Sequence, residues 1–141
     1  MKLLIDTNVI LDVLIKRQTF YDNSKAVLKL CEIRKIQGFI TASSVTDIFY
    51  LVRKAIKNVD ETYKIIGALL NIVDVLNVNS QDVQNAFITR AKDFEDCLMA
   101  ECAKSNKCSG ILTYSPCLKA GDSSIYNVAR LLWSYYVSAT S

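Results

Sequence analysis

The chain has no histidine among its 141 residues, and this absence removes several kinds of chemistry at once. A Ser-His-Asp triad and a Cys-His pair both need an imidazole as general base. A structural zinc site that mixes cysteine and histidine ligands is not expected for the same reason. Any hydrolysis by this chain has to use carboxylates as the catalytic groups, and we expect a metal ion to assist them.

Cysteine pairs are absent too. The five cysteines are odd in number and none forms a Cys-x-x-Cys pair, so we expect reduced, partly buried thiols. No run of about eighteen apolar residues exists, and a membrane span is therefore not expected. The N-terminus leads directly into a strand, unlike a signal peptide, which predicts a cytoplasmic protein.

Glycine, proline and runs of like charge are also scarce. With one proline, four glycines, 51% hydrophobic and 22% charged residues, the composition is typical of a packed globular domain. We expect a single domain over residues 1–141. The net charge of +3 permits a nucleic acid partner but does not argue for one, because no basic run is present.

The apolar residues alternate between short buried runs and helical spacing along most of the chain. Strands are predicted at 2–6, 38–42, 73–78 and 110–113. Helices are predicted at 8–16, 22–36, 43–57, 60–72, 80–91 and 93–105, with Gly38 as the C-cap of the second. Strands separated by helices predict an α/β fold with a parallel sheet. After Tyr114 the pattern is atypical. Residues 124–128 are compatible with a fifth strand, and residues 131–137 are compatible with either a terminal helix or a strand.

Acidic residues recur at the predicted strand ends and helix starts. Asp6 follows the first strand, Asp47 lies in the first turn after the second, and Asp93 and Asp96 open the helix before the fourth. In a parallel sheet these positions fall at the carboxyl edge, where ligands bind. Each acid also has a simpler interpretation: Asp6 and Asp93 fit N-caps, and Ser44-x-x-Asp47 fits a capping box. Together, clustered carboxylates favour a site for Mg²⁺ or Mn²⁺.

Three stretches resemble the PIN domain family, most closely its small prokaryotic VapC-type toxins. They are Leu4 to Asp12 (Leu-Ile-Asp-Thr-Asn-Val-Ile-Leu-Asp), Ile40 to Tyr50, and Lys92 to Leu98 (Lys-Asp-Phe-Glu-Asp-Cys-Leu). The resemblance covers residues 1 to 113. It implies a three-layer α/β/α fold with a short parallel sheet and a metal-dependent ribonuclease.

The resemblance also implies roles for individual residues. Asp6, Asp47 and Asp96 would hold Mg²⁺ or Mn²⁺ and carry catalysis, and Asp93 would be a nearby second acid. Asn8 would orient Asp6 or a metal-bound water, and Thr113 would line the site from the fourth strand.

Two departures from the family pattern matter. Asp47 stands where many members have Glu. After Thr113 the family usually continues with Arg-Asn or Arg-Asp and often a further acid, whereas this chain has Tyr114-Ser-Pro. The fourth acid is absent from its usual place, and Asp122 is the only carboxylate downstream. The number of bound metal ions, one or two, is therefore not decided by the sequence.

The leading hypothesis is an endoribonuclease that hydrolyses RNA phosphodiesters, as the toxin of a toxin–antitoxin pair, with an antitoxin as partner. The alternative is a catalytically impaired PIN-like domain that acts as a binding protein, which the missing acid motivates. A phosphatase of the haloacid dehalogenase kind ranks well behind, because Asn8 replaces the second Asp that it needs.

Further expectations concern partners and surfaces. Basic side chains at Lys16, Arg17, Arg53, Lys54 and Lys57 are candidate phosphate contacts, although a solvated face is the simpler interpretation. Trp133 and the neighbouring tyrosines belong either to a homodimer interface or to the core, and a homodimer is expected.

Overall fold

The protein folds around a parallel sheet of five strands in the order β3-β2-β1-β4-β5. The computed structural model describes residues 1–114 and 125–140. Within these residues the strands are β1 (Lys2–Ile5), β2 (Gln37–Thr41), β3 (Asp74–Leu76), β4 (Gly110–Thr113) and β5 (Ile125–Asn127). The helices are α1 (Thr7–Leu14), α2 (Tyr21–Glu32), α3 (Ala42–Ile56), α4 (Val59–Ile72), α5 (Ser80–Thr89), α6 (Phe94–Ser105) and α7 (Val128–Thr140).

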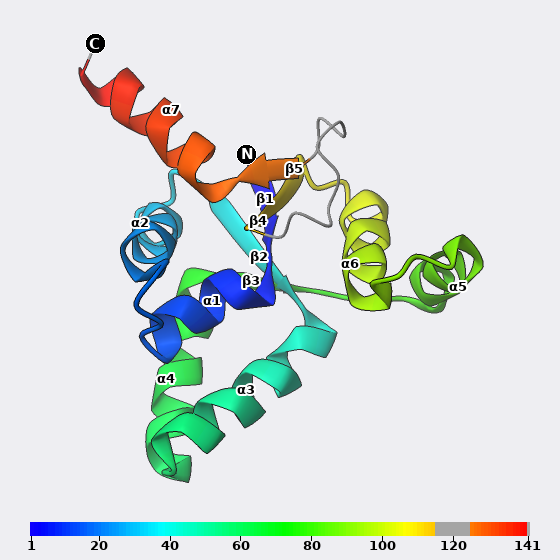
Figure 1. Cartoon of the computed structure of the whole chain (residues 1–141), viewed down its shortest axis with the longest axis horizontal. Helices are drawn as coiled ribbons and strands as arrows, with labels where there is room; N and C mark the ends of the chain where they lie inside the picture. The colour runs from blue at the N-terminus through cyan, green and yellow to red at the C-terminus, as the bar shows by residue number, and fades with distance from the viewer. Residues whose placement is uncertain (115–124, 141) are drawn as a thin grey trace.

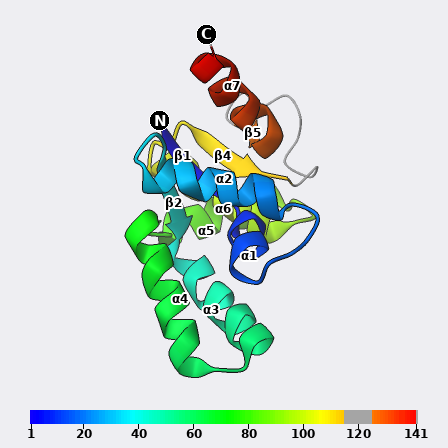
Figure 2. The ribbon, with the colours of Figure 1, turned by 90° about the vertical axis from the view of Figure 1, so that its left-hand side faces the viewer.

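Helices cover both faces of the sheet and make a three-layer α/β/α arrangement (Figures 1 and 2). Leu3 and Ile5 of β1 point into the larger core, which α1 to α4 and α7 cover, whereas Leu4 points into a smaller core beneath α6. Successive strand residues alternate between faces, so a fully apolar strand feeds both cores. This explains why the buried strands contain continuous apolar runs, and it confirms the predicted fold class.

The predicted element order is confirmed over the first four strands and six helices. The fifth strand also forms, as β5, and residues 131–137 lie within helix α7. Residues 115–124, which include Asp122, lie outside the described residues. In the described parts of the chain, every helix is too short or too polar to span a bilayer.

One glycine has a different role from the predicted one. Helix α2 ends at Glu32, and Arg34 takes the left-handed conformation in the turn that follows, with a φ of 61°. Gly38 therefore is no C-cap but a buried residue of β2. A Cβ atom at Gly38 would lie 2.7 Å from Sγ of Cys31 and 2.9 Å from Cδ1 of Ile5. The close approach of α2 and β1 to β2 is the reason for a glycine at this position.

The cysteines whose structure is described are all free thiols, as predicted: Cys31, Cys97, Cys102 and Cys108. Cys31 and Cys102 are completely buried. They pack in the two different cores, one on each face of the sheet.

Candidate functional site

The carboxyl ends of the two central strands bring Asp6 and Thr113 together. Strands β1 and β4 pair in parallel with Ile5 opposite Leu112, so the residues that follow them are neighbours. The Thr113 hydroxyl donates a hydrogen bond to Oδ2 of Asp6 at 2.6 Å. Asp6 is 7% exposed and Thr113 is 2% exposed. Asp6 is thus held, nearly buried, at the carboxyl edge of the sheet.

Helix α1 begins directly after Asp6 and fixes the second oxygen of the same carboxylate. Oδ1 of Asp6 accepts a hydrogen bond from the backbone N–H of Asn8 at 3.3 Å. The interpretation of Asp6 as an N-cap is therefore confirmed. Capping does not remove it from other chemistry, because a carboxylate can accept about four hydrogen bonds or metal contacts, and these two use only half of them.

Asp47 lies on the third helix but takes no part in capping it. The N-cap of α3 is Thr41, whose Oγ1 accepts a hydrogen bond from the backbone N–H of Ser44 at 3.2 Å. The predicted Ser44-x-x-Asp47 capping box is wrong, because the helix starts a full turn before that pattern requires. Asp47 is exposed on α3 and free of the structural role that sequence reasoning offered for it.

Asp93 is the N-cap of α6, as predicted, and its Oδ1 accepts a hydrogen bond from the backbone N–H of Asp96 at 3.0 Å. The side chain of Asp93 is exposed and Asp96 is half-buried. Both acids lie in or beside the first turn of α6, where the helix dipole favours negative charge.

Electrostatic coupling shows that these elements converge. The pKa of the Glu95 carboxyl is raised above its ordinary value of 4.5, first by burial and then by neighbouring negative charges. Those charges belong to Asp47, Asp93 and Asp6, in decreasing order of effect. Acids from α3, from the start of α6 and from the end of β1 therefore share one neighbourhood, the acidic cluster of Asp6, Asp47, Asp93 and Glu95.

Glu95 was not among the predicted site residues. The signal available in the sequence was the presence of three acids within the four residues from Asp93 to Asp96. The prediction covered only Asp93 and Asp96, from their place at the start of the predicted helix.

The acids are near enough to repel one another without forming a ready ligand shell. Among residues 1–114 and 125–140, no three acidic or cysteine side chains lie close enough together to coordinate one metal ion. The donor set is nevertheless made only of carboxylate oxygens, which suits a hard cation such as Mg²⁺ or Mn²⁺. Such a cation would also relieve the repulsion that raises the pKa of Glu95.

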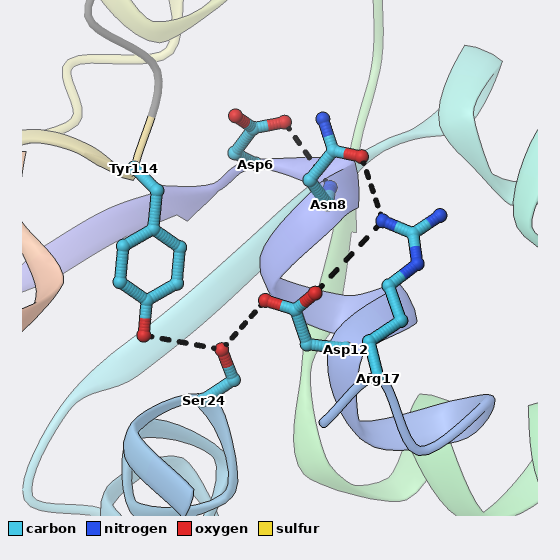
Figure 3. Close-up of polar contacts among 6 residues, drawn as sticks. All are labelled: Asp6, Asn8, Asp12, Arg17, Ser24 and Tyr114. Atoms are coloured by element: carbon cyan, nitrogen blue, oxygen red, sulfur yellow. Dashed lines mark hydrogen bonds and ion pairs between the residues drawn. The ribbon is translucent and has the colours of Figure 1, made fainter. Parts of the chain in front are cut away.

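A second polar network lies beside the acidic cluster, on α1 and α2 (Figure 3). Nη1 of Arg17 donates to Oδ1 of Asn8 at 3.2 Å and lies 3.8 Å from Oδ1 of Asp12. Oγ of Ser24 lies 3.0 Å from Oδ2 of Asp12 and 3.3 Å from the hydroxyl oxygen of Tyr114. Tyr114 is the residue that replaces the expected arginine after Thr113. In this structure its side chain turns toward α2.

The pKa of the Tyr114 hydroxyl is raised by its burial and, to a smaller extent, by the charge of Asp12, while the hydrogen bond with Ser24 opposes the shift. Its ring stacks on Phe20, with 4.3 Å between centroids. Tyr114 is therefore a neutral, partly buried residue anchored by Phe20 and Ser24, unlike the cationic residue expected at this position.

Comparison with known families and structures agrees with the architecture. The model of the PIN domain family matches residues 2–115 of this chain. No curated protein sequence matches it.

Solved structures with the same fold are similar in shape and distant in sequence. A toxin–antitoxin complex from Klebsiella pneumoniae has a TM-score of 0.66 at 15% identity, covering 89% of this chain and 97% of that one. VapBC2 from Rickettsia felis, bound to a DNA fragment from its promoter, has a TM-score of 0.62 at 15% identity, covering 82% and 89%. VapC20 of Mycobacterium tuberculosis, described as a toxin that cleaves the sarcin-ricin loop, has a TM-score of 0.59 at 14% identity, covering 86% and 92%.

Proposed function

Because the chain belongs to the PIN domain family, we propose that it is a metal-dependent endoribonuclease that hydrolyses RNA phosphodiesters. The observation that carries the proposal is the acidic cluster at the carboxyl edge of the sheet. Negative charges on Asp47, Asp93 and Asp6 add to the effect of burial on the Glu95 pKa, and such clustering of like charges is typical of sites that bind a cation or act in catalysis.

The residues proposed to hold Mg²⁺ or Mn²⁺ are Asp6, Asp47 and Asp96, with Asp93 and Glu95 adding negative charge beside them. When bound, the cation supplies the positive charge that activates a water molecule and offsets charge on the phosphodiester in the transition state. Asp6 is held in one orientation, because the Thr113 hydroxyl and the Asn8 N–H bind one oxygen each. These two bonds support the predicted role of Asn8 in orienting Asp6, and we propose the same role for Thr113, which was predicted to line the site.

The direct test is cleavage of a labelled RNA by the purified protein with Mn²⁺, with and without EDTA. Asp6→Asn is the informative variant, since Asn preserves the N-cap of α1 while removing the charge. Asp60→Asn, in the first turn of α4, is a matched control. We expect wild type and Asp60→Asn to cut the RNA, and Asp6→Asn to be inactive. Equal cleavage by Asp6→Asn would refute the assignment.

A non-catalytic binding role is the second candidate, and one observation favours it. Tyr114 follows Thr113 where the resemblance predicts an arginine, and its side chain is engaged with Ser24 and Phe20. A domain that had lost catalysis would have no need to retain metal affinity. Titration calorimetry with Mn²⁺ separates the two candidates: binding that disappears in Asp6→Asn supports the nuclease, and no binding by wild type supports the alternative.

We further propose that the protein is the toxin of a toxin–antitoxin pair with a protein antitoxin as its partner. Support comes from the fold that it shares with the Klebsiella complex and with VapBC2. Induced expression in a bacterial host should arrest growth, and co-expression of the neighbouring open reading frame should restore it. Arrest by Asp6→Asn equal to that by wild type would contradict the toxin role.

The expected homodimer also remains a proposal. Trp133 and Tyr136 of α7 are 66% and 62% exposed, so the core does not cover them. Light scattering coupled to size exclusion measures the mass directly.

A further inference from the structure

The buried carboxylate of Asp12 has no part in the acidic cluster and needs an explanation of its own. It lies on α1 and is 3% exposed. A buried carboxylate is costly unless hydrogen bonds or a cation compensate it. Its two oxygens face different partners: Oδ2 accepts from Ser24 at 3.0 Å, and Oδ1 lies 3.8 Å from Nη1 of Arg17.

A chain of hydroxyl groups fixes the side of Asp12 that faces away from Arg17. Ser24 has one hydroxyl hydrogen, and the carboxylate can only accept. The Ser24 hydroxyl is the donor in both of its contacts, to Oδ2 of Asp12 at 3.0 Å and to the Tyr114 hydroxyl oxygen at 3.3 Å, so one hydrogen is shared between the two acceptors. Phe20 stacks on the ring of Tyr114, so the row of contacts from Asp12 through Ser24 to Tyr114 is also held at the tyrosine end.

Arg17 is held by both its backbone and its side chain. Its N–H donates to the carbonyl oxygen of Asp12 at 2.9 Å, in the turn that ends α1. Its guanidinium then returns along the helix, where Nη1 contacts Asp12 and Asn8 (Figure 3). The other described ion pairs join residues three apart on one helix surface, whereas Arg17 has a buried partner.

The position of Arg17 connects it to the proposed catalytic edge. Asn8, which accepts its hydrogen bond, is also the residue whose backbone N–H binds Oδ1 of Asp6. The side chain of Arg17 is 42% exposed, so it can meet a ligand without leaving its partners. The described contacts use Nη1, and a guanidinium has five N–H donors in a planar fork suited to phosphate.

We propose that Arg17 is a phosphate-binding residue of the RNA site, fixed in place by the positioning residues Asp12, Ser24 and Tyr114. This inference rests on the proposed nuclease function. An acidic cluster repels RNA, and a rigid cation beside Asp6 supplies the attraction for a backbone phosphate next to the one that is cut. The ligand class is thus the RNA backbone, independent of its sequence.

Binding and cleavage test this with Arg17→Gln as the main variant and Lys64→Gln as the matched control. Lys64 is likewise a cation in an ion pair, with Glu61 on α4. Binding of a labelled single-stranded RNA is measured by anisotropy in EDTA across a range of KCl concentrations. We expect Arg17→Gln to weaken binding about tenfold. The slope of log binding constant against log KCl concentration should become shallower by roughly one, as for the loss of one phosphate contact, and Lys64→Gln should match wild type in both.

Steady-state cleavage in Mn²⁺ gives the second readout. For Arg17→Gln we expect KM to rise about tenfold, with the change in kcat smaller than the change in KM. Arg17→Lys keeps the charge but loses the planar fork, so its KM should lie between the two. Ser24→Ala and Tyr114→Phe should raise KM in the same direction. Ser24→Ala should also lower the melting temperature, because the buried Asp12 carboxylate loses a donor.

The outcomes separate this inference from the proposed function. If wild type cuts RNA and Arg17→Gln matches it in KM and salt slope, the inference is overturned and the nuclease stands. If wild type does not cut RNA but Arg17→Gln still loses binding and salt slope, the nuclease fails and the phosphate site stands. Should Arg17→Gln prove unstable, an Arg17→Lys variant with unchanged melting temperature and unchanged KM overturns it instead.

Discussion

The hydroxyl of Thr113 lies 2.6 Å from Oδ2 of Asp6 and joins the ends of the two central strands. The two residues are 107 positions apart in the chain, and the parallel pairing of β1 and β4 brings them together. With the Asn8 N–H on the other oxygen, the carboxylate is held on both sides. The orientation of the proposed metal ligand therefore depends on the sheet register.

Replacing Thr113 with Val should test this dependence, because Val has nearly the same shape and no hydroxyl. We expect RNA cleavage and Mn²⁺ affinity to fall about tenfold to a hundredfold, as for other residues that orient metal ligands. The free energy of unfolding should fall by about 1–3 kcal/mol, since a buried acceptor loses its donor. Thr113→Ser keeps the hydroxyl and should retain activity. A Val variant that matches wild type in both readouts would show that Thr113 does not orient Asp6.

Glu95 should have opposite effects on the protein with and without metal. In Glu95→Gln one negative charge leaves the acidic cluster, so the metal-free protein should melt at a slightly higher temperature. Mn²⁺ should bind about threefold to tenfold more weakly, because the cation loses one attractive neighbour. Calorimetry and thermal melting measure the two effects, with Glu61→Gln as a control distant from the cluster. A variant that binds Mn²⁺ as tightly as wild type would remove Glu95 from the site.

The element order was predictable because each element's apolar spacing is a local property of the sequence. Successive side chains of strand β1 pack into the two cores in turn, so its sequence is a continuous apolar run. Helices such as α3 have one apolar face. Asp6 and Asp93 were correctly placed at helix starts for the same local reason.

Features that depend on distant residues were not predictable in this way. The contact between Ser24 and Tyr114 spans 90 positions, and no local pattern marks it. The cap of α3 was assigned wrongly because Thr41 and Ser44 are both good N-cap residues, and only the path of β2 decides between them. Glu95 was missed because its neighbours Asp47 and Asp6 come from other elements.

Two glycine substitutions should change stability in opposite directions. In Gly38→Ala the new Cβ would lie 2.7 Å from Sγ of Cys31, so the packed interior must shift. We expect a loss of about 1–3 kcal/mol in the free energy of unfolding. Gly67 is exposed on α4 and has nothing within 4 Å of an added Cβ, so Gly67→Ala should gain about 0.5–1 kcal/mol. Urea denaturation measures both, and a Gly38→Ala protein as stable as wild type would contradict the tight contact.

The buried thiols should make the protein less stable at alkaline pH. Burial raises the pKa of Cys31 from 9.0 to about 11, partly offset by Arg34. Burial, aided by Asp82 and Cys108, raises the pKa of Cys102 to about 11 as well. A raised pKa in the folded state means that the unfolded state loses its protons first as pH rises. The stabilising contribution is therefore complete below pH 9 and is lost progressively up to about pH 11.

Urea denaturation between pH 8 and 11 measures this loss, and Cys31→Ala isolates one thiol. The variant leaves a small cavity and should be less stable at every pH. Its stability should nevertheless fall less steeply above pH 9 than that of wild type, because one ionisation is gone. Lysine and tyrosine side chains titrate in the same range in both proteins, so only the difference between the two slopes is diagnostic. Parallel slopes would mean that the Cys31 thiol ionises as easily in the folded chain as in the unfolded one.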